Sequence, residues 1–93
     1  MTVLPFGPER IRSVGIVSGG GTRLVSEAID QGLDLYITGD ASHEVYHESL
    51  EAGINVVSAG HYATETWGVR NMMAYTEAHT ELRTTFIDLP TGL

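Results

Sequence analysis

Gly32-Leu33-Asp34-Leu35-Tyr36 is followed twenty-one residues later by Gly53-Ile54-Asn55-Val56-Val57, and these two stretches decide the fold. The similarity extends over residues 27–44 and 48–65, so the sequence contains an internal repeat of one structural unit. Each unit ends a helix at a glycine, a residue that suits the left-handed backbone conformation found there. The apolar run after the glycine predicts a strand, and the start of another helix follows it.

Elements of the same kind are predicted on either side of the repeat. Residues 14–17 form a third apolar run, which leads into the glycine-rich turn 18–22. Apolar residues predict a helix from about 64 to 79, and 84–87 reads as a last strand that ends before a proline.

Strands that alternate with helices are joined by crossovers and build parallel sheets. We therefore expect an α/β fold with three layers, in the order βαβαβαβ, and a mainly parallel sheet in which the direction of the last strand is left open. Residues 1–9 would be a lead segment, and residues 10–93 a single α/β domain.

Composition excludes several classes of protein. The 93 residues carry twelve acidic side chains against five arginines, a net charge of −7, which disfavours nucleic acid as the main partner. The chain has no cysteine, so a bound metal would depend on imidazole, carboxylate and water. No targeting segment or run of membrane-spanning length is found, and we expect a cytoplasmic protein without a membrane partner.

A parallel sheet would bring three strand-to-helix turns, 18–22, 38–43 and 60–65, to one edge, where open α/β folds place their sites. The side chains and backbone expected to line a pocket there are Gly19, Gly20, Gly21, Asp40 and His43. The glycines could approach a phosphate closely, although the lysine of a nucleotide-binding loop is missing. The competing interpretation is three similar turns that share no ligand.

The third turn carries the strongest chemical signal, Gly60-His61-Tyr62-Ala63-Thr64-Glu65. His61 follows a predicted strand, and Glu65 falls in the first turn of the next helix if that helix begins at Tyr62 or Thr64. An imidazole and a carboxylate at one mouth are candidate metal ligands. Ordinary helix capping and a histidine bonded to a nearby carbonyl explain the same residues without a ligand.

The order of these stretches resembles the carboxyl-terminal half of the Nif-three-like dinuclear metal-centre proteins (NGG-interacting factor three family), also named GTP cyclohydrolase 1 type 2 homologs. The resemblance covers about residues 8–93, and its most specific part is the string that contains His61 and Glu65. The other matching stretches are Val17-Ser18-Gly19-Gly20-Gly21, Tyr36-Ile37-Thr38-Gly39-Asp40 and Thr85-Phe86-Ile87-Asp88.

The resemblance implies that His61 and Glu65 are two ligands of a pair of divalent metals, zinc, manganese or iron, and that Asp40 lines the pocket. In the family the remaining ligands come from an amino-terminal half with a histidine pair, and this sequence has no adjacent histidines. We therefore expect the metal-binding half of a dinuclear-metal hydrolase-like protein, incomplete and inactive alone. Expected partners are a separate amino-terminal half and further copies in a homo-oligomer, since the family forms toroidal oligomers. The alternative is a non-catalytic oligomerisation or protein-interaction domain.

Overall fold

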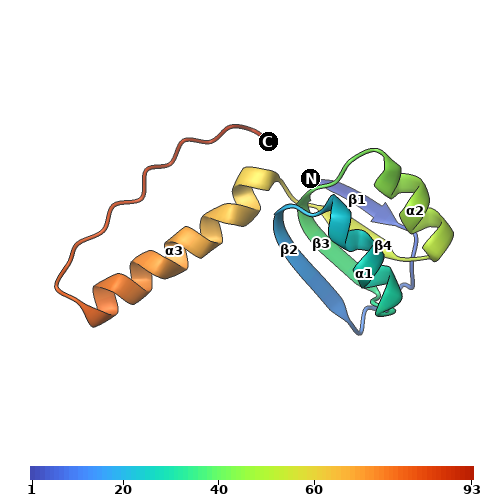
Figure 1. Cartoon of the computed structure of the whole chain (residues 1–93), viewed down its shortest axis with the longest axis horizontal. Helices are drawn as coiled ribbons and strands as arrows, with labels where there is room; N and C mark the ends of the chain where they lie inside the picture. The colour runs from blue at the N-terminus through green and yellow to red at the C-terminus, as the bar shows by residue number, and fades with distance from the viewer.

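The computed structural model describes all residues from 1 to 93 and has two parts, an α/β body and a long helix that leads away from it (Figure 1). The strands are β1 (Thr2–Pro5), β2 (Val14–Gly20), β3 (Leu35–Asp40) and β4 (Asn55–Ser58). The helices are the short 3-10 turn η1 (Thr22–Leu24), α1 (Val25–Asp30), α2 (Glu44–Ala52) and α3 (His61–His79).

The four strands form one sheet in the order β1-β4-β3-β2. The strands β2, β3 and β4 are parallel to one another, whereas β1 pairs antiparallel with β4. The expected α/β fold with a mainly parallel sheet is confirmed. The antiparallel strand comes from 2–5, within the segment that the sequence analysis separated from the domain, and not from the carboxyl-terminal end.

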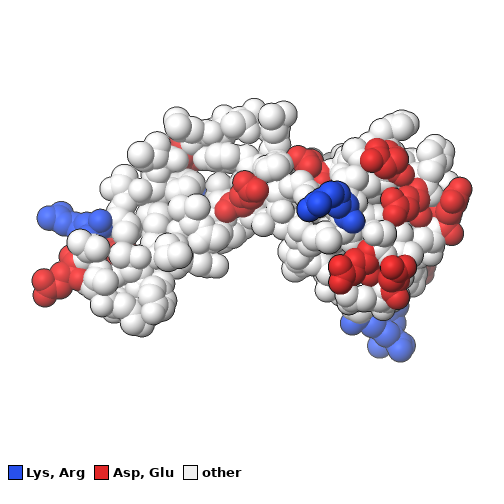
Figure 2. Space-filling view, viewed as in Figure 1, with Lys and Arg blue, Asp and Glu red and all other residues white.

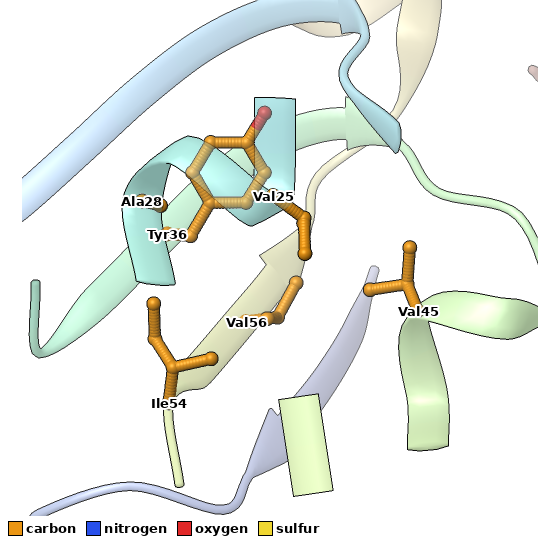
Figure 3. Packing of buried hydrophobic residues seen from close by; sticks show 6 residues of the cluster. All are labelled: Val25, Ala28, Tyr36, Val45, Ile54 and Val56. Atoms are coloured by element: carbon orange, nitrogen blue, oxygen red, sulfur yellow. The ribbon is translucent and has the colours of Figure 1, made fainter. Parts of the chain in front are cut away.

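The core lies between the sheet and the two short helices (Figure 3). Tyr36 and Val56 point from β3 and β4 toward Val25 of α1 and Val45 of α2, and each is at most 2% exposed. Because successive strand residues alternate between the faces, Ile16 and Ile37 point to the opposite side. Ile16 is 72% exposed there, so no helix of this chain covers that face. The expected third layer is not formed, because α3 leads away from the sheet.

The strand predicted at 84–87 is also absent. After α3 the chain runs back beside the helix as an extended segment without a strand partner. It is attached by side chains and by one backbone hydrogen bond, in which Tyr62 N donates to Leu93 O at 3.0 Å. The Arg70 guanidinium lies 4.9 Å from the ring of Phe86, and the Tyr62 hydroxyl donates to Asp88 Oδ1 at 2.6 Å. A strand needs the free backbone groups of a sheet edge, and the edges of this sheet lie in the body, away from that segment.

The repeated glycines behave as the sequence indicates. Gly32 and Gly53 have φ of 68° and 70°, and Gly53 caps the end of α2 in the left-handed conformation. No helix of the structure combines the length and the apolar character that crossing a membrane requires.

Candidate functional site

The candidate site lies where the parallel strands end and the body meets α3. β2 ends at Gly20, β3 at Asp40 and β4 at Ser58, all at the carboxyl edge of the sheet. The three turns are tied together by backbone hydrogen bonds, since Gly21 N donates to Asp40 O at 3.2 Å and Gly60 N donates to Gly39 O at 2.7 Å. The turns that the sequence analysis expected at one edge are therefore neighbours.

Glycine makes this close approach possible. A Cβ atom on Gly39 would overlap the backbone oxygen of Gly19, and one on Gly19 would overlap the carboxylate of Glu65. Gly19 also has φ of 71°, a conformation that side chains disfavour. Its N–H donates to Thr64 Oγ1 at 3.0 Å, and that hydroxyl donates in turn to Gly60 O at 2.9 Å. The first turn of α3 is thereby fixed to the end of β2.

α3 begins at His61, earlier than the start near Tyr62 or Thr64 that the sequence analysis expected. Gly60, with φ of 105°, lets the chain turn directly from β4 into the helix. Glu65 consequently lies in the second turn, not the first. His61 and Glu65 are four residues apart on one continuous helix, and this spacing places both side chains on the same face.

The imidazole of His61 lies between two carboxylates. Its Nδ1 donates to Asp40 Oδ2 at 2.6 Å, and its Nε2 lies 3.2 Å from Glu65 Oε1. The ring is 41% exposed and each carboxylate about half exposed, at 55%, so the group faces solvent at the edge of the sheet. The hydrogen bond to Asp40 is the main effect that raises the pKa of His61. Desolvation opposes this rise, and the nearby charges of Glu65 and Asp40 add to it.

Two of the three predicted pocket glycines line this group. Gly19 lies beside Glu65 and His61, and Gly20 lies beside Asp40. Gly21 is turned inward instead: it packs against Thr38, and its carbonyl accepts a hydrogen bond from the Tyr36 hydroxyl at 2.7 Å.

His43 lies outside the cluster of Asp40, His61 and Glu65. It immediately precedes α2, and its ring faces His47 edge-on with the ring centres 6.5 Å apart. It lines a different hollow, between α2 and β1, together with Thr2, Leu4 and Tyr46.

Thr64 is the residue of the candidate site that the sequence analysis missed, because it was considered only as a possible start of the helix. Its hydroxyl holds Gly19 against α3. The available signal was its position in the same short string as His61 and Glu65. The chain brings no group of three or more histidine, aspartate, glutamate or cysteine side chains into an arrangement that could hold a metal ion.

Comparison with known proteins gives consistent matches over nearly the whole chain. The model of the family described as Duf34/NIF3 (NGG1p interacting factor 3) matches residues 1–91. A GTP cyclohydrolase 1 type 2 homolog of Archaeoglobus fulgidus is 47% identical over 91 residues, which are 98% of this chain and 37% of the relative. The homolog of Treponema pallidum is 44% identical over 98% of this chain and 32% of its own length.

The solved structures extend the match to the long helix. The crystal structure of TTHA1606 from Thermus thermophilus superposes with a TM-score of 0.91 and 43% identity, covering 99% of this chain and 37% of that one. A superposition of this extent includes α3 and the segment after it. The chain spans roughly a third of the length of the relatives that it matches.

Proposed function

Because the chain belongs to the Duf34/NIF3 (NGG1p interacting factor 3) family, we propose that it is the metal-binding part of a dinuclear-metal hydrolase-like protein, with His61 and Glu65 as two of the ligands. Its relatives are named GTP cyclohydrolase 1 type 2 homologs. The observation that carries the proposal is the 3.2 Å approach of His61 Nε2 to Glu65 Oε1.

This approach is stabilised by a proton or a metal ion between the two atoms. When Nδ1 carries the proton that it donates to Asp40, the neutral imidazole has a lone pair on Nε2. That lone pair then faces a carboxylate oxygen, and two electron-rich atoms at 3.2 Å repel unless a proton or a metal ion lies between them. Two ligands that each lie about 2.1 Å from a metal can be at most about 4.2 Å apart, so the observed separation fits a shared ion.

The types of donor agree with the metals that the family resemblance implies. Imidazole nitrogen and carboxylate oxygen bind zinc, manganese and iron, and no thiolate is available in this chain. Asp40 fits the role of a positioning residue, because a metal-binding histidine commonly donates its other N–H to a carboxylate that fixes the ring.

The ligand set in this chain is incomplete. Two donors converge, whereas a tight site needs at least three protein ligands, and no such group occurs. The chain also covers only 37% of its Archaeoglobus relative. We infer that a further polypeptide segment, either a separate amino-terminal half or the rest of a longer chain, supplies the remaining ligands, and that the chain alone is inactive.

A bound divalent metal would supply Lewis acidity and lower the pKa of a water molecule for hydrolysis. The residues of this chain would orient the ligands. Asp40 holds the His61 ring, and Thr64 holds the start of α3 against Gly19, so that Nε2 and the Glu65 carboxylate keep their spacing. The exposed position at the sheet edge leaves the group open to a second protein segment and to a nucleotide or similar substrate.

Calorimetric titration with zinc or manganese tests the assignment, first on the chain alone and then with the matching amino-terminal half of a relative. We expect weak binding alone and tight binding in the complex. His61→Gln and Glu65→Gln should each weaken the tight binding at least about tenfold, since even residues that only support a ligand change affinity 10- to 100-fold. His47→Gln is the matched control and should bind as the unsubstituted chain does. Absence of binding in both formats would reject the metal assignment.

A second function, as a non-catalytic oligomerisation or interaction domain, is favoured by a different observation. Trp67, Val69, Met72 and Tyr75 of α3 are all more than half exposed. Large exposed apolar surfaces commonly mark contacts with other proteins. This function does not depend on His61 or Glu65, so a chain that assembles normally after both are substituted and never binds metal would favour it over the metal site.

A further inference from the structure

The hollow between α2 and β1 lies on the face of the sheet that the short helices cover. Its volume is about 190 Å³, the room of about six water molecules. Pockets for drug-sized ligands enclose about 300–1,000 Å³, so this hollow fits a molecule of about one ring. The Tyr46 wall is held by Phe6, whose ring meets it edge-on with the centres 5.1 Å apart. The apolar lining consists of Leu4, Val45, Tyr46 and Val56.

Polar side chains lie at the mouth of the hollow. Thr2, Ser42 and His43 are exposed there, and Ser58 is half-buried behind them. The Ser58 hydroxyl donates to Gly39 O at 3.0 Å and keeps lone pairs that can accept a hydrogen bond. The Thr2 hydroxyl and the His43 ring have no hydrogen-bond partner in the chain. Hydroxyl and imidazole groups can donate and accept, so the mouth suits the polar edge of a ring.

The lining of the hollow contains no aspartate, glutamate, lysine or arginine, although these residues make up 18% of the chain. Figure 2 shows acidic side chains gathered over the body and few along α3. A charged ligand in the hollow would lose its hydration without meeting an opposite charge. The lining therefore favours a neutral ring with polar atoms on its edge over an anion or a cation.

The hollow opens at the same edge of the sheet as the candidate site. His43 is three residues after Asp40, and Ser58 is three residues before His61. Thr2 pairs with Ser58 at the end of β4, so the β1 wall also reaches this edge. Three residues span at most about 11 Å, which brings the hollow and the candidate site within reach of one small molecule. Open α/β folds bind their ligands at this edge.

We propose that the hollow holds a neutral ring of the substrate, with the polar edge of the ring bonded to Thr2, His43 and Ser58. This assignment rests on the proposed function, in which His61 and Glu65 are metal ligands beside the reacting group. The hollow selects the substrate by its ring and orients the attached group toward the candidate site.

NMR titration of the metal-free chain with uracil tests the ring site, because uracil is a neutral ring with polar groups on its edge. We expect shifts of the Thr2, Ser42, His43 and Ser58 amide resonances and a Kd near or below about 1 mM. Benzoate has a ring of the same size and a negative charge, and it should bind at least about tenfold more weakly. Equal binding of the two ligands, or shifts confined to other residues, would overturn the proposal.

Substitutions at the mouth locate the bound ring. Thr2→Trp fills the hollow, on a strand where aromatic residues are well tolerated, and should abolish the uracil shifts. Val3→Trp is the matched control, since Val3 points to the other face of the sheet and is 52% exposed. His43→Phe keeps a ring but removes its nitrogens, and should raise the Kd about fivefold, the value of one hydrogen bond. The same spectra establish that each variant is folded, and equal losses at positions 2 and 3 would contradict the assignment.

A second measurement relates the ring to the metal ligands. In the complex with the matching amino-terminal half, Mn²⁺ bound at His61 and Glu65 should broaden the uracil resonances, because unpaired electrons relax nearby nuclei. The broadening should vanish in Thr2→Trp. Uracil binding without broadening, in a complex whose calorimetry shows bound Mn²⁺, would overturn the link to the substrate. A complex that binds no Mn²⁺ would instead reject the metal assignment, whereas the metal-free titration decides the ring site independently.

Discussion

The body and α3 differ in how many of their residues are buried. In the body, Ile54 and five apolar residues of α1, α2, β3 and β4 form one buried cluster. Polar groups such as Thr38 and Ser49 are buried there with hydrogen-bond partners. In α3, nineteen residues include none that is buried. The body can therefore be explained by its own packing, whereas α3 depends on its junction with the body and on whatever covers it.

The same difference separates the two ends of α3. Its first turn is held by Gly19, Gly39 and Asp40 of the body, and the candidate site lies at that junction. At its far end, Glu77 accepts hydrogen bonds from Thr84 of the segment that follows the helix. The superposition on TTHA1606 covers 99% of the chain, so α3 takes the same direction relative to the sheet in a solved relative.

The largest effect is expected from a glycine at the junction. Gly39→Ala places a methyl group against the backbone of Gly19, which has no flexible atoms to give way. It should lower the free energy of unfolding by about 3 kcal/mol, the upper end for overpacking, as measured by urea denaturation. Gly68→Ala in α3 is the control: nothing lies within 4 Å of the added atom, and the higher helix propensity of alanine should stabilise the chain by up to about 1 kcal/mol. Equal effects at the two positions would contradict the close packing of the turns.

The second test removes apolar atoms from each region. Val56→Ala should cost about 2 kcal/mol at every protein concentration, because Val56 is 1% exposed in the core. Trp67→Ala removes a larger side chain but should change stability by less than about 0.5 kcal/mol in dilute, monomeric samples, because Trp67 is 62% exposed. Thermal denaturation over a range of concentrations measures both. If Trp67→Ala strongly lowers stability in dilute samples, α3 is packed within its own chain.

The third test concerns the segment after α3. Leu89 N donates to the Tyr62 hydroxyl at 2.9 Å, and that hydroxyl donates to Asp88. Tyr62→Phe removes both bonds at a net cost of about 1 kcal/mol, so hydrogen exchange of the Leu89 amide should accelerate about fivefold. Tyr75→Phe is the matched control, since Tyr75 contacts His79 by ring stacking. Unchanged exchange in Tyr62→Phe would mean that the segment is held by other contacts.

The sequence predicted the body well because its signals are local. The glycine that ends each helix, the apolar run after it and the repeat at twenty-one residues all act within one unit of the chain. The alternation of strands and helices then leads to parallel crossovers. Asp40, His61 and Glu65 could be placed near one another for the same reason, since Asp40 ends the parallel strand β3 and the other two lie in the helix that follows β4.

The errors arose where structure depends on contacts that a sequence pattern does not encode. The run 84–87 has strand composition but lies beside α3, away from any sheet edge. The third layer was expected from the alternation of strands and helices, but α3 leads away from the sheet after Gly60. The start of α3 was placed too late because polar capping residues were preferred over a glycine with positive φ, which hid the four-residue spacing of His61 and Glu65 on one helix.

The smallest expected effect is at the charged contact between body and helix. Asp40→Asn keeps an oxygen that can accept the proton of His61 Nδ1 but removes the negative charge. The pKa of His61, which Asp40 raises, should therefore fall toward 6.5 in the metal-free chain. NMR titration of the imidazole resonances measures the change, with His79 at the other end of α3 as an internal reference.

The sign of the stability change follows from the raised pKa. In the unsubstituted chain the contact with charged His61 stabilises the fold fully below about pH 6.5, and this contribution disappears as the pH rises through the folded-state pKa. Asp40→Asn should remove most of that pH dependence and leave the part due to Glu65, with little other loss of stability, because solvent screens an ion pair whose partners are 41% and 55% exposed. Identical titration curves would mean that the 2.6 Å contact is not maintained in solution. Gly39→Ala is expected to lower stability far more than Asp40→Asn does. The close packing of the turns therefore holds α3 to the body, and the Asp40 carboxylate mainly orients the His61 imidazole.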